Sequence, residues 1–268
     1  MTDIFDLETA IDLRFHAAHS IIRKAASLAQ TMQPAPGKPI ADLKGHQDYV
    51  TEADRAVETF VTTHLAALFP EDAFLGEEHG GVSSGLFRWI IDPIDGTSNY
   101  ARGRNRWCIS LGLMYQDAPV AGIIEAPALQ ETFTARKGKG AFLNDSPIKT
   151  STTSSLKEAM VEVGWSPYVP EGWYPEKMQA LLDKGAMPRS LGSGALALAD
   201  VACGRSDGYH EFVIFLWDVA AALVLLEEAG ACVSPFLKMG GLTQRTTILA
   251  SAPTIASTLS DTLGVPFD

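Results

Sequence analysis

The sequence feature that most constrains the fold is WIIDPIDGTSNY at residues 89–100, where an apolar run leads directly into two aspartates. Trp89, Ile90 and Ile91 have the character of a strand that is buried on both faces. Asp92 and Asp95 are therefore expected at or just past the C-terminal end of this strand. In open α/β sheets ligands bind at that edge, so the stretch predicts a ligand site.

The composition is that of an ordinary soluble globular protein. The chain has 268 residues, of which 46% are hydrophobic and 20% are charged, enough for one large domain or two closely packed halves. No apolar run approaches the roughly 18 residues that a transmembrane helix needs. The N-terminal MTDIFDLETAIDLRF lacks a cationic segment that leads into an apolar one. We therefore expect a cytoplasmic protein without a membrane partner.

The net charge and the cysteines argue against two further classes, namely nucleic-acid-binding proteins and proteins built on disulfides or zinc. The net charge of −11 argues against nucleic acid as the main partner, because phosphate contacts depend on clustered Lys and Arg. The cysteines, Cys108, Cys203 and Cys232, are odd in number and show no CxxC spacing. The pattern favours buried free thiols over a disulfide framework or a zinc site.

Apolar residues at helical spacing predict two helices in the first part of the chain. The first covers residues 7–29 and ends before the breaker stretch QPAPGKP at 33–39. The second is expected to begin near Thr51 and to stop at Pro70. Its expected core stripe consists of Ala53, Val57, Phe60, Val61, His64, Leu65 and Leu68.

The rest of the chain alternates strands and helices. A strand at 87–91 is followed by an antiparallel meander over 107–144. We expect a soft boundary between an N-terminal half, 1–146, and a C-terminal half, 147–268, that pack closely. For the second half we expect strands at 160–163 and near 209, 233 and 248, and helices at 175–182, 195–203 and 217–229.

Acidic residues gather at three places, in the motifs GEEHG, DPIDG and WD. Each has a local alternative: Glu77 and Glu78 could lie in an exposed turn, Asp92 and Asp95 could initiate a turn, and Asp218 could be a helix N-cap. Carboxylates at the ends of buried strands, however, lose hydration and repel one another unless a cation compensates them. Oxygen ligands without His or Cys point to Mg²⁺, Mn²⁺ or Ca²⁺ rather than zinc.

The residues after Asp95 suggest what such cations would bind. Gly96, Thr97 and Ser98 combine a flexible glycine with two hydroxyls, which suits the presentation of N–H groups and hydroxyls to an anion. Carboxylates beside an anion cradle indicate a metal-bridged phosphate, since divalent cations reverse the local field of an acidic protein. Two metals about 3.5–4 Å apart could activate water and stabilise the leaving oxygen of an in-line displacement.

Five motifs in order resemble the inositol monophosphatase family: DYVTEAD at 48–54, GEE at 76–78, WIIDPIDGTSN at 89–99, ARKGKGAF at 135–142 and WDVAAALVLLEEAG at 217–230. The resemblance implies an α/β fold of the layered α+β kind, the αβαβα sandwich of the inositol monophosphatase and fructose bisphosphatase type. It also implies Mg²⁺-dependent, lithium-sensitive hydrolysis of a phosphomonoester by a homodimer.

The resemblance further implies a set of metal ligands. Glu77, Asp92 and the carbonyl of Ile94 would hold one metal. Asp92, Asp95 and Asp218 would hold the second, with Asp92 as the bridge. Two or three Mg²⁺ ions per active site are implied, with Mn²⁺ as an alternative.

Catalytic and phosphate-binding roles follow from the same resemblance. Asp95, Gly96 and Thr97 would bind the phosphate, the last two through backbone N–H groups. Thr97 and Asp54 would orient and deprotonate the attacking water, beside the metal held by Glu77. A carboxylate behind a hydroxyl is a plausible proton relay. The alternative for Asp54 is a solvated charge at an acidic helix start.

Substrate choice is expected in the second half of the chain. Gly192, Ser193 and Gly194 match the loop with which the family contacts the alcohol part of the substrate, and Glu211 matches a carboxylate that accepts from its hydroxyls. The alternatives are a plain helix entry for the loop and an exposed strand-end carboxylate for Glu211. The expected substrate is inositol monophosphate or a similar small polyol phosphate.

Other functions within the resemblance stay open. Phosphatases for histidinol phosphate, fructose bisphosphate or phosphoadenosine phosphate share the metal motif. A regulatory or binding protein of the same family would not need the ligands, whereas this chain has the full set together with Asp54 and Thr97. The sequence therefore favours an enzyme.

Overall fold

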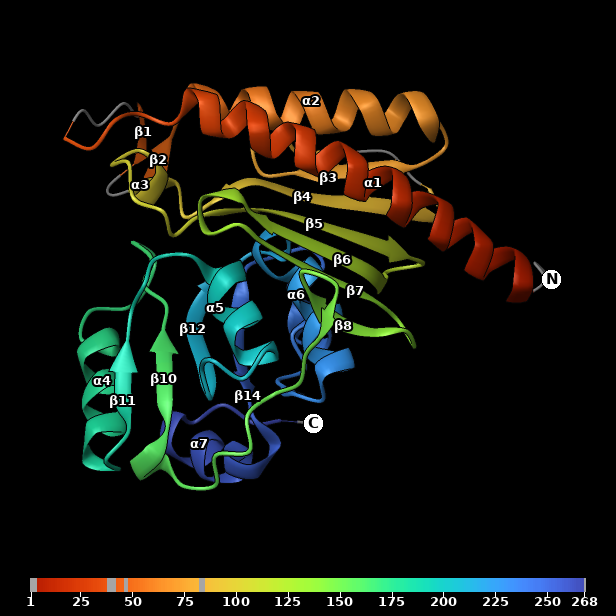
Figure 1. The fold of residues 1–268 in the computed structure, drawn as a ribbon. Helices are drawn as coiled ribbons and strands as arrows, with labels where there is room; N and C mark the ends of the chain where they lie inside the picture. The colour runs from red at the N-terminus through yellow and green to blue at the C-terminus, as the bar shows by residue number, and fades with distance from the viewer. Residues whose placement is uncertain (1–3, 38–41, 46–47, 82–84, 268) are drawn as a thin grey trace.

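The structure is a computed structural model that describes residues 4–37, 42–45, 48–81 and 85–267. Helices and sheets alternate in layers (Figure 1): α1 and α2, a seven-stranded sheet, α5 and α6, a five-stranded sheet, then α4 and α7. This arrangement confirms the expected αβαβα sandwich. No helix in the described ranges is long and apolar enough to cross a membrane. The helices are α1 (Ile4–Met32), α2 (Glu52–Leu68), α3 (Thr97–Tyr100), α4 (Trp173–Asp183), α5 (Gly194–Ala202), α6 (Leu216–Ala229) and α7 (Ala256–Leu263).

The seven-stranded sheet has the strand order β3-β4-β5-β6-β7-β8-β9. β3 is parallel to β4, and every other pair is antiparallel, which confirms the predicted meander. A separate two-stranded antiparallel sheet pairs β1 (Asp42–Gly45) with β2 (Asp48–Val50). The strands of the large sheet are β3 (Ala73–Gly76), β4 (Phe87–Asp95), β5 (Cys108–Tyr115), β6 (Ala118–Ala126), β7 (Glu131–Arg136), β8 (Gly140–Leu143) and β9 (Ser146–Pro147).

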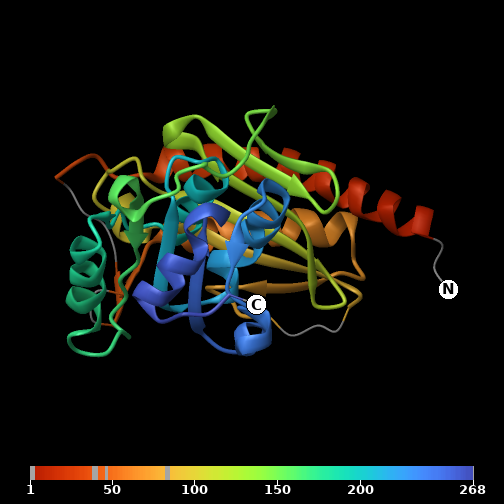
Figure 2. The same cartoon turned by 90° about the horizontal axis from the view of Figure 1, so that it is seen from below.

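The five-stranded sheet has the order β11-β10-β12-β14-β13 and mixes both directions. β10 is parallel to β11 and β12, whereas β14 is antiparallel to β12 and β13. Seen from below (Figure 2), α4 and α7 cover the outer face of this sheet. Its strands are β10 (Met160–Val163), β11 (Met187–Arg189), β12 (Gly208–Ile214), β13 (Cys232–Val233) and β14 (Thr246–Ser251).

Short turns of helix complete the connections between these elements. Leu237–Gly241 is a wide π-type turn before β14, and the others are of the 3₁₀ type. The turns are η1 (Pro127–Leu129), η2 (Leu156–Glu158), η3 (Leu237–Gly241) and η4 (Pro253–Ile255).

The buried face of α2 differs from the predicted stripe. His64 and Leu68 are exposed, the latter by 58%, so their assignment to the core was wrong. The His64 ring instead lies on the surface against Phe60, with 4.1 Å between ring centroids. Asp54 and Glu58 are buried in their place, at i and i+4 on one side of the helix.

β4 is longer than predicted, because it continues past Ile91 to Asp95. Its register against β5 shifts between the two aspartates: Asp92 pairs with Ser110, and Asp95 pairs with Cys108. The chain thus advances by three residues on β4 and by only two residues on β5, which is the geometry of a bulge. Bulges disrupt the ladder locally and re-aim side chains beside active sites.

The two sheets share a continuous core through α6. Gly122 of β6 faces α6 so closely that a Cβ there would lie 2.2 Å from the carbonyl oxygen of Ala221. A boundary between residues 146 and 147 would fall inside β9, which pairs with β8. The halves pack closely, and their division into 1–146 and 147–268 stays a prediction.

Candidate active site

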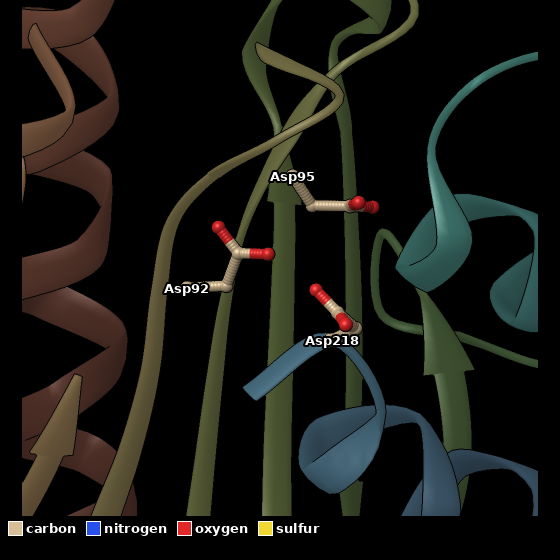
Figure 3. Close-up of side chains that lie close together, drawn as sticks. All are labelled: Asp92, Asp95 and Asp218. Atoms are coloured by element: carbon tan, nitrogen blue, oxygen red, sulfur yellow. The ribbon is translucent and has the colours of Figure 1, made fainter. Parts of the chain in front are cut away.

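Three carboxylates from two separate parts of the chain meet between the sheets. Asp92 and Asp95 come from the end of β4, and Asp218 comes from the first turn of α6. Each offers an oxygen within 4.8 Å of the others. Figure 3 shows the carboxyl groups of Asp92 and Asp218 turned toward one another, with that of Asp95 beside them. Asp92 and Asp95 are buried, and Asp218 is partly buried.

The electrostatics of this cluster fit a divalent cation. Burial, followed by the charges of Glu77, Asp95 and Asp218, holds the pKa of Asp92 well above its usual range. Burial and the Asp95 charge raise the pKa of Asp218 to about 8. Among the described residues no Lys, Arg or His forms an ion pair with Asp92, Asp95 or Asp218. An all-oxygen donor set with uncompensated negative charge is the kind that Mg²⁺ and Mn²⁺ prefer.

Asp95 also ties the two halves of the protein together. Its carboxylate accepts hydrogen bonds from the Ser193 hydroxyl, from Gly194 N at 3.1 Å and from Ala195 N at 2.8 Å, all at the start of α5. These bonds oppose the effect of burial, which raises the pKa of Asp95. The predicted loop of Gly192, Ser193 and Gly194 therefore lies directly beside the carboxylate cluster.

Glu77 lies just outside the group of three. It follows β3, and its N–H donates to the Ile91 carbonyl at 3.2 Å, so its backbone runs beside β4. Its charge contributes the largest electrostatic part of the raised pKa of Asp92, after the effect of burial. In the bulge between Asp92 and Asp95, Ile94 N donates to Asp92 Oδ1 at 3.0 Å, and the Ile94 carbonyl accepts from Thr97 Oγ1 at 2.9 Å.

Asp54 and Thr97 approach one another from α2 and α3. The distance from Thr97 Oγ1 to Asp54 Oδ1 is 3.4 Å. The other Asp54 oxygen accepts from the hydroxyl of Thr51 and from its N–H, the latter at 2.7 Å. Burial raises the pKa of Asp54 to about 6, although the two hydrogen bonds from Thr51 lower it. Asp54 is fully buried, so it is not a solvated charge at a helix start.

Gly96 makes the turn between the carboxylates and α3. Its φ of 90° lies in the left-handed region, which favours glycine, and a Cβ would lie 2.9 Å from the Arg106 carbonyl. The backbone therefore reverses tightly here and brings Thr97 next to the bulge between Asp92 and Asp95.

A cavity of about 280 Å³ adjoins the cluster, and Glu211 lines it together with Asp95, Ser193 and Asp218. Glu211 is only 8% exposed, which rules out the alternative of an exposed strand-end carboxylate. The Tyr209 hydroxyl donates to Glu211 Oε2. Burial raises the pKa of Glu211 to about 7, and the hydrogen bond from Tyr209 opposes that rise.

Sequence reasoning missed residues that hold these groups in place. Asn99 Nδ2 donates to the carbonyls of Leu191 at 2.8 Å and Gly192 at 3.2 Å, so it ties α3 to the loop before α5. The position of Asn99 at the end of the motif at 89–99 was the sequence signal that could have identified it. Tyr209 lies two residues before Glu211, on the same face of β12, and this spacing could have identified it as a partner.

The fold and the site together define a class: a layered α/β protein with a largely buried carboxylate cluster that could hold metal, next to a cavity that Asp95, Asp218 and Glu211 help to line. A model of the inositol monophosphatase family matches residues 6–263. The chain belongs to this family, and as a member it is a phosphoric monoester hydrolase.

Known relatives agree with this assignment. The chain is 38% identical over 237 residues to an inositol-1-monophosphatase of Synechocystis sp., covering 86% of this chain and 80% of the relative. It is also 38% identical over 195 residues to a protein of Xylella fastidiosa named Nus factor SuhB, covering 72% and 71%. The solved inositol monophosphatase of Anabaena (Nostoc) superposes with a TM-score of 0.81 at 35% identity, over 97% of this chain and 98% of the other.

Proposed function

We propose that the protein hydrolyses inositol monophosphate or a similar small polyol phosphate, with Mg²⁺ held by the carboxylate cluster. The observation that carries this proposal is the cavity that Asp95 and Asp218, two members of the carboxylate cluster, line together with the buried carboxylate of Glu211. The cluster suits a metal-bridged phosphate, and Glu211 suits hydroxyl groups on the alcohol part of the same substrate.

Each residue has a role in this proposal. Asp92, Asp95 and Asp218 would hold Mg²⁺, with Glu77 and the Ile94 carbonyl as further ligands. Bound Mg²⁺ would polarise the phosphoryl group and lower the pKa of water. Two or three ions are proposed, with Mn²⁺ as a substitute.

The remaining groups would handle the water and the phosphate. Thr97 would orient the attacking water through its hydroxyl, and Asp54, 3.4 Å from that hydroxyl, would accept the proton. The backbone N–H groups of Gly96 and Thr97, with Asp95 nearby, would bind the phosphate. Water attack on phosphorus would then release the alcohol and leave inorganic phosphate.

Other members of the substrate class remain alternatives, namely histidinol phosphate, fructose bisphosphate and phosphoadenosine phosphate. A regulatory role is the second candidate function, because one relative bears the name Nus factor SuhB. Catalysis is favoured because the Thr97–Asp54 pair and the carboxylate cluster are both present. We further propose a cytoplasmic, lithium-sensitive homodimer.

The test is phosphate release from inositol phosphates, histidinol phosphate, fructose bisphosphate and phosphoadenosine phosphate, with Mg²⁺, Mn²⁺ or EDTA. We expect the highest kcat/KM with an inositol monophosphate and no release in EDTA. Comparable turnover in EDTA would contradict the metal requirement. A preference for one of the other compounds would reassign the substrate, and no release from any of them would favour the regulatory role.

Changing Glu211 tests how the substrate is recognised. We expect Glu211→Gln to lower kcat/KM for a polyol phosphate by about 1.5–3 kcal/mol, the typical worth of a hydrogen bond to a charged group. Hydrolysis of an aryl phosphate without hydroxyls should scarcely change, and the Mg²⁺ requirement should stay the same. Equal losses on both substrates would instead assign Glu211 a structural or metal-binding role.

A further inference from the structure

Glu58 is a buried carboxylate that lies outside the three-carboxylate cluster. It is 2% exposed and lies on α2, one helical turn after Asp54. Its side chain accepts three hydrogen bonds from the two residues that follow Glu77. Oε2 accepts from Glu78 N at 2.8 Å, and Oε1 accepts from His79 N at 3.0 Å and contacts His79 Nδ1 at 2.9 Å.

The end of β3 is shaped around this carboxylate. A Cβ on Gly76 would lie 2.2 Å from Glu58 Oε1, a separation that real contacts do not reach. Gly76 does not have a left-handed backbone, so the need for glycine comes from the close approach of Glu58. The backbone of Glu77 is thus held on both sides. The residue before it, Gly76, packs directly on the Glu58 carboxylate, and the N–H groups of the two residues after it, Glu78 and His79, donate to that same carboxylate.

We propose that Glu58 is a positioning residue, which fixes the backbone around Glu77 so that the Glu77 carboxylate is ready to bind metal. The inference rests on the proposed function, in which Glu77 is a metal ligand. Hydrogen bonds from N–H groups to a carboxylate are about twice as strong as hydrogen bonds between neutral groups. The bonds from Glu78 N and His79 N to Glu58 are therefore a strong anchor for this backbone. Because Asp54 and Glu58 belong to the same helix, α2 supports both the metal-binding segment and the water-orienting carboxylate.

Without the anchor, Glu77 would have to be ordered when the metal binds, and that ordering weakens binding. Residues that support metal ligands typically contribute about 10–100-fold in metal affinity. The effect should appear in the affinity for Mg²⁺, whereas kcat at saturating Mg²⁺ should change little because the assembled site is the same.

The test is Glu58→Gln, which keeps the size of the side chain but replaces one acceptor oxygen with an NH₂ group that faces an N–H donor. Calorimetry with Mg²⁺ on EDTA-stripped protein should show about 10–100-fold weaker binding, and the half-saturating Mg²⁺ for turnover should rise by the same factor. The KM for substrate at saturating Mg²⁺ should stay within a factor of about three, since the cavity around Glu211 is unchanged.

A matched control is Glu52→Gln, which removes the same charge from an exposed position of the same helix and should leave Mg²⁺ affinity unchanged. Glu58→Asp is the second variant. It keeps the charge but shortens the reach to Glu78 N and His79 N, so it should also weaken Mg²⁺ binding even if Glu58→Gln fails to fold.

Several outcomes would overturn the inference. These are wild-type Mg²⁺ affinity in a folded Glu58 variant, an equal loss in Glu52→Gln, or a lower melting temperature without any change in Mg²⁺ affinity. If the wild-type protein itself neither binds Mg²⁺ nor releases phosphate, the proposed function fails first and the inference fails with it.

Discussion

Replacing Asp92 with asparagine is expected to abolish phosphate release while the protein stays folded. Asp92 is the most central carboxylate of the site, since Glu77, Asp95 and Asp218 all raise its pKa. An amide supplies one neutral oxygen where a bridging carboxylate supplies two charged ones. Turnover should fall by more than about 10⁴-fold, the scale for removing one member of a concerted active site. Near-normal phosphate release at saturating Mg²⁺ would contradict the proposed role of Asp92 as a metal bridge.

The same variant should be more stable than the wild type when metal is removed. A carboxyl whose pKa is raised in the folded state binds more protons there than in the unfolded chain, so its contribution to stability is lost as pH rises. For Asp218 that loss extends from its usual pKa of 3.8 to about 8. Asp92 also has a raised pKa, and because an asparagine in its place does not titrate, this part of the pH-dependent loss is absent from Asp92→Asn. Thermal unfolding in EDTA should therefore favour the variant more at pH 8 than at pH 5, and the reverse order would contradict this account.

The individual parts of the site could be predicted because each is marked locally. A buried apolar strand that runs into Asp92 and Asp95 indicates a site at the strand end, whatever the rest of the chain does. The start of α6 close to Asp218 is likewise visible in the sequence pattern. That Asp218 lies next to Asp92 and Asp95 is not marked locally, because it depends on how α6 packs against the large sheet. Only the resemblance to a family predicted it.

Glu58, which supports the segment after β3, could not be predicted, because its partners are distant in the sequence. The expected apolar stripe on α2 includes His64 and omits Glu58, whereas in the structure His64 is exposed and Glu58 is buried. Only the fold shows that the segment after β3 donates its N–H groups to Glu58. The C-terminal helix α7 was missed for a related reason: its Ser- and Thr-rich sequence has weak helical preference, and packing of Leu259 and Leu263 stabilises it.

Thr97 and Asp54, the pair proposed to orient the attacking water, offer the second large effect. We expect Thr97→Ala and Asp54→Asn each to lower kcat by about 10²–10⁴-fold, the usual scale of general acid–base assistance. The wild-type kcat/KM should fall as pH drops through about 6, the raised pKa of Asp54, because a base must be ionised to accept a proton. In Asp54→Asn this acid limb should disappear from the pH profile, although the remaining activity is low.

The double variant decides whether Thr97 and Asp54 act as one relay. Their side chains are 3.4 Å apart, and Asp54 receives its other hydrogen bonds from Thr51, so loss of Thr97 leaves Asp54 without the hydroxyl through which it would act. Residues that act as a unit are strongly non-additive, so the double variant should lose little more than the worse single one. Thermal unfolding controls for damage at the start of α2, since Asp54→Asn also weakens the cap on Thr51. Losses in kcat that multiply in the double variant would show that the two residues act independently, and the proton acceptor would then have to be another group.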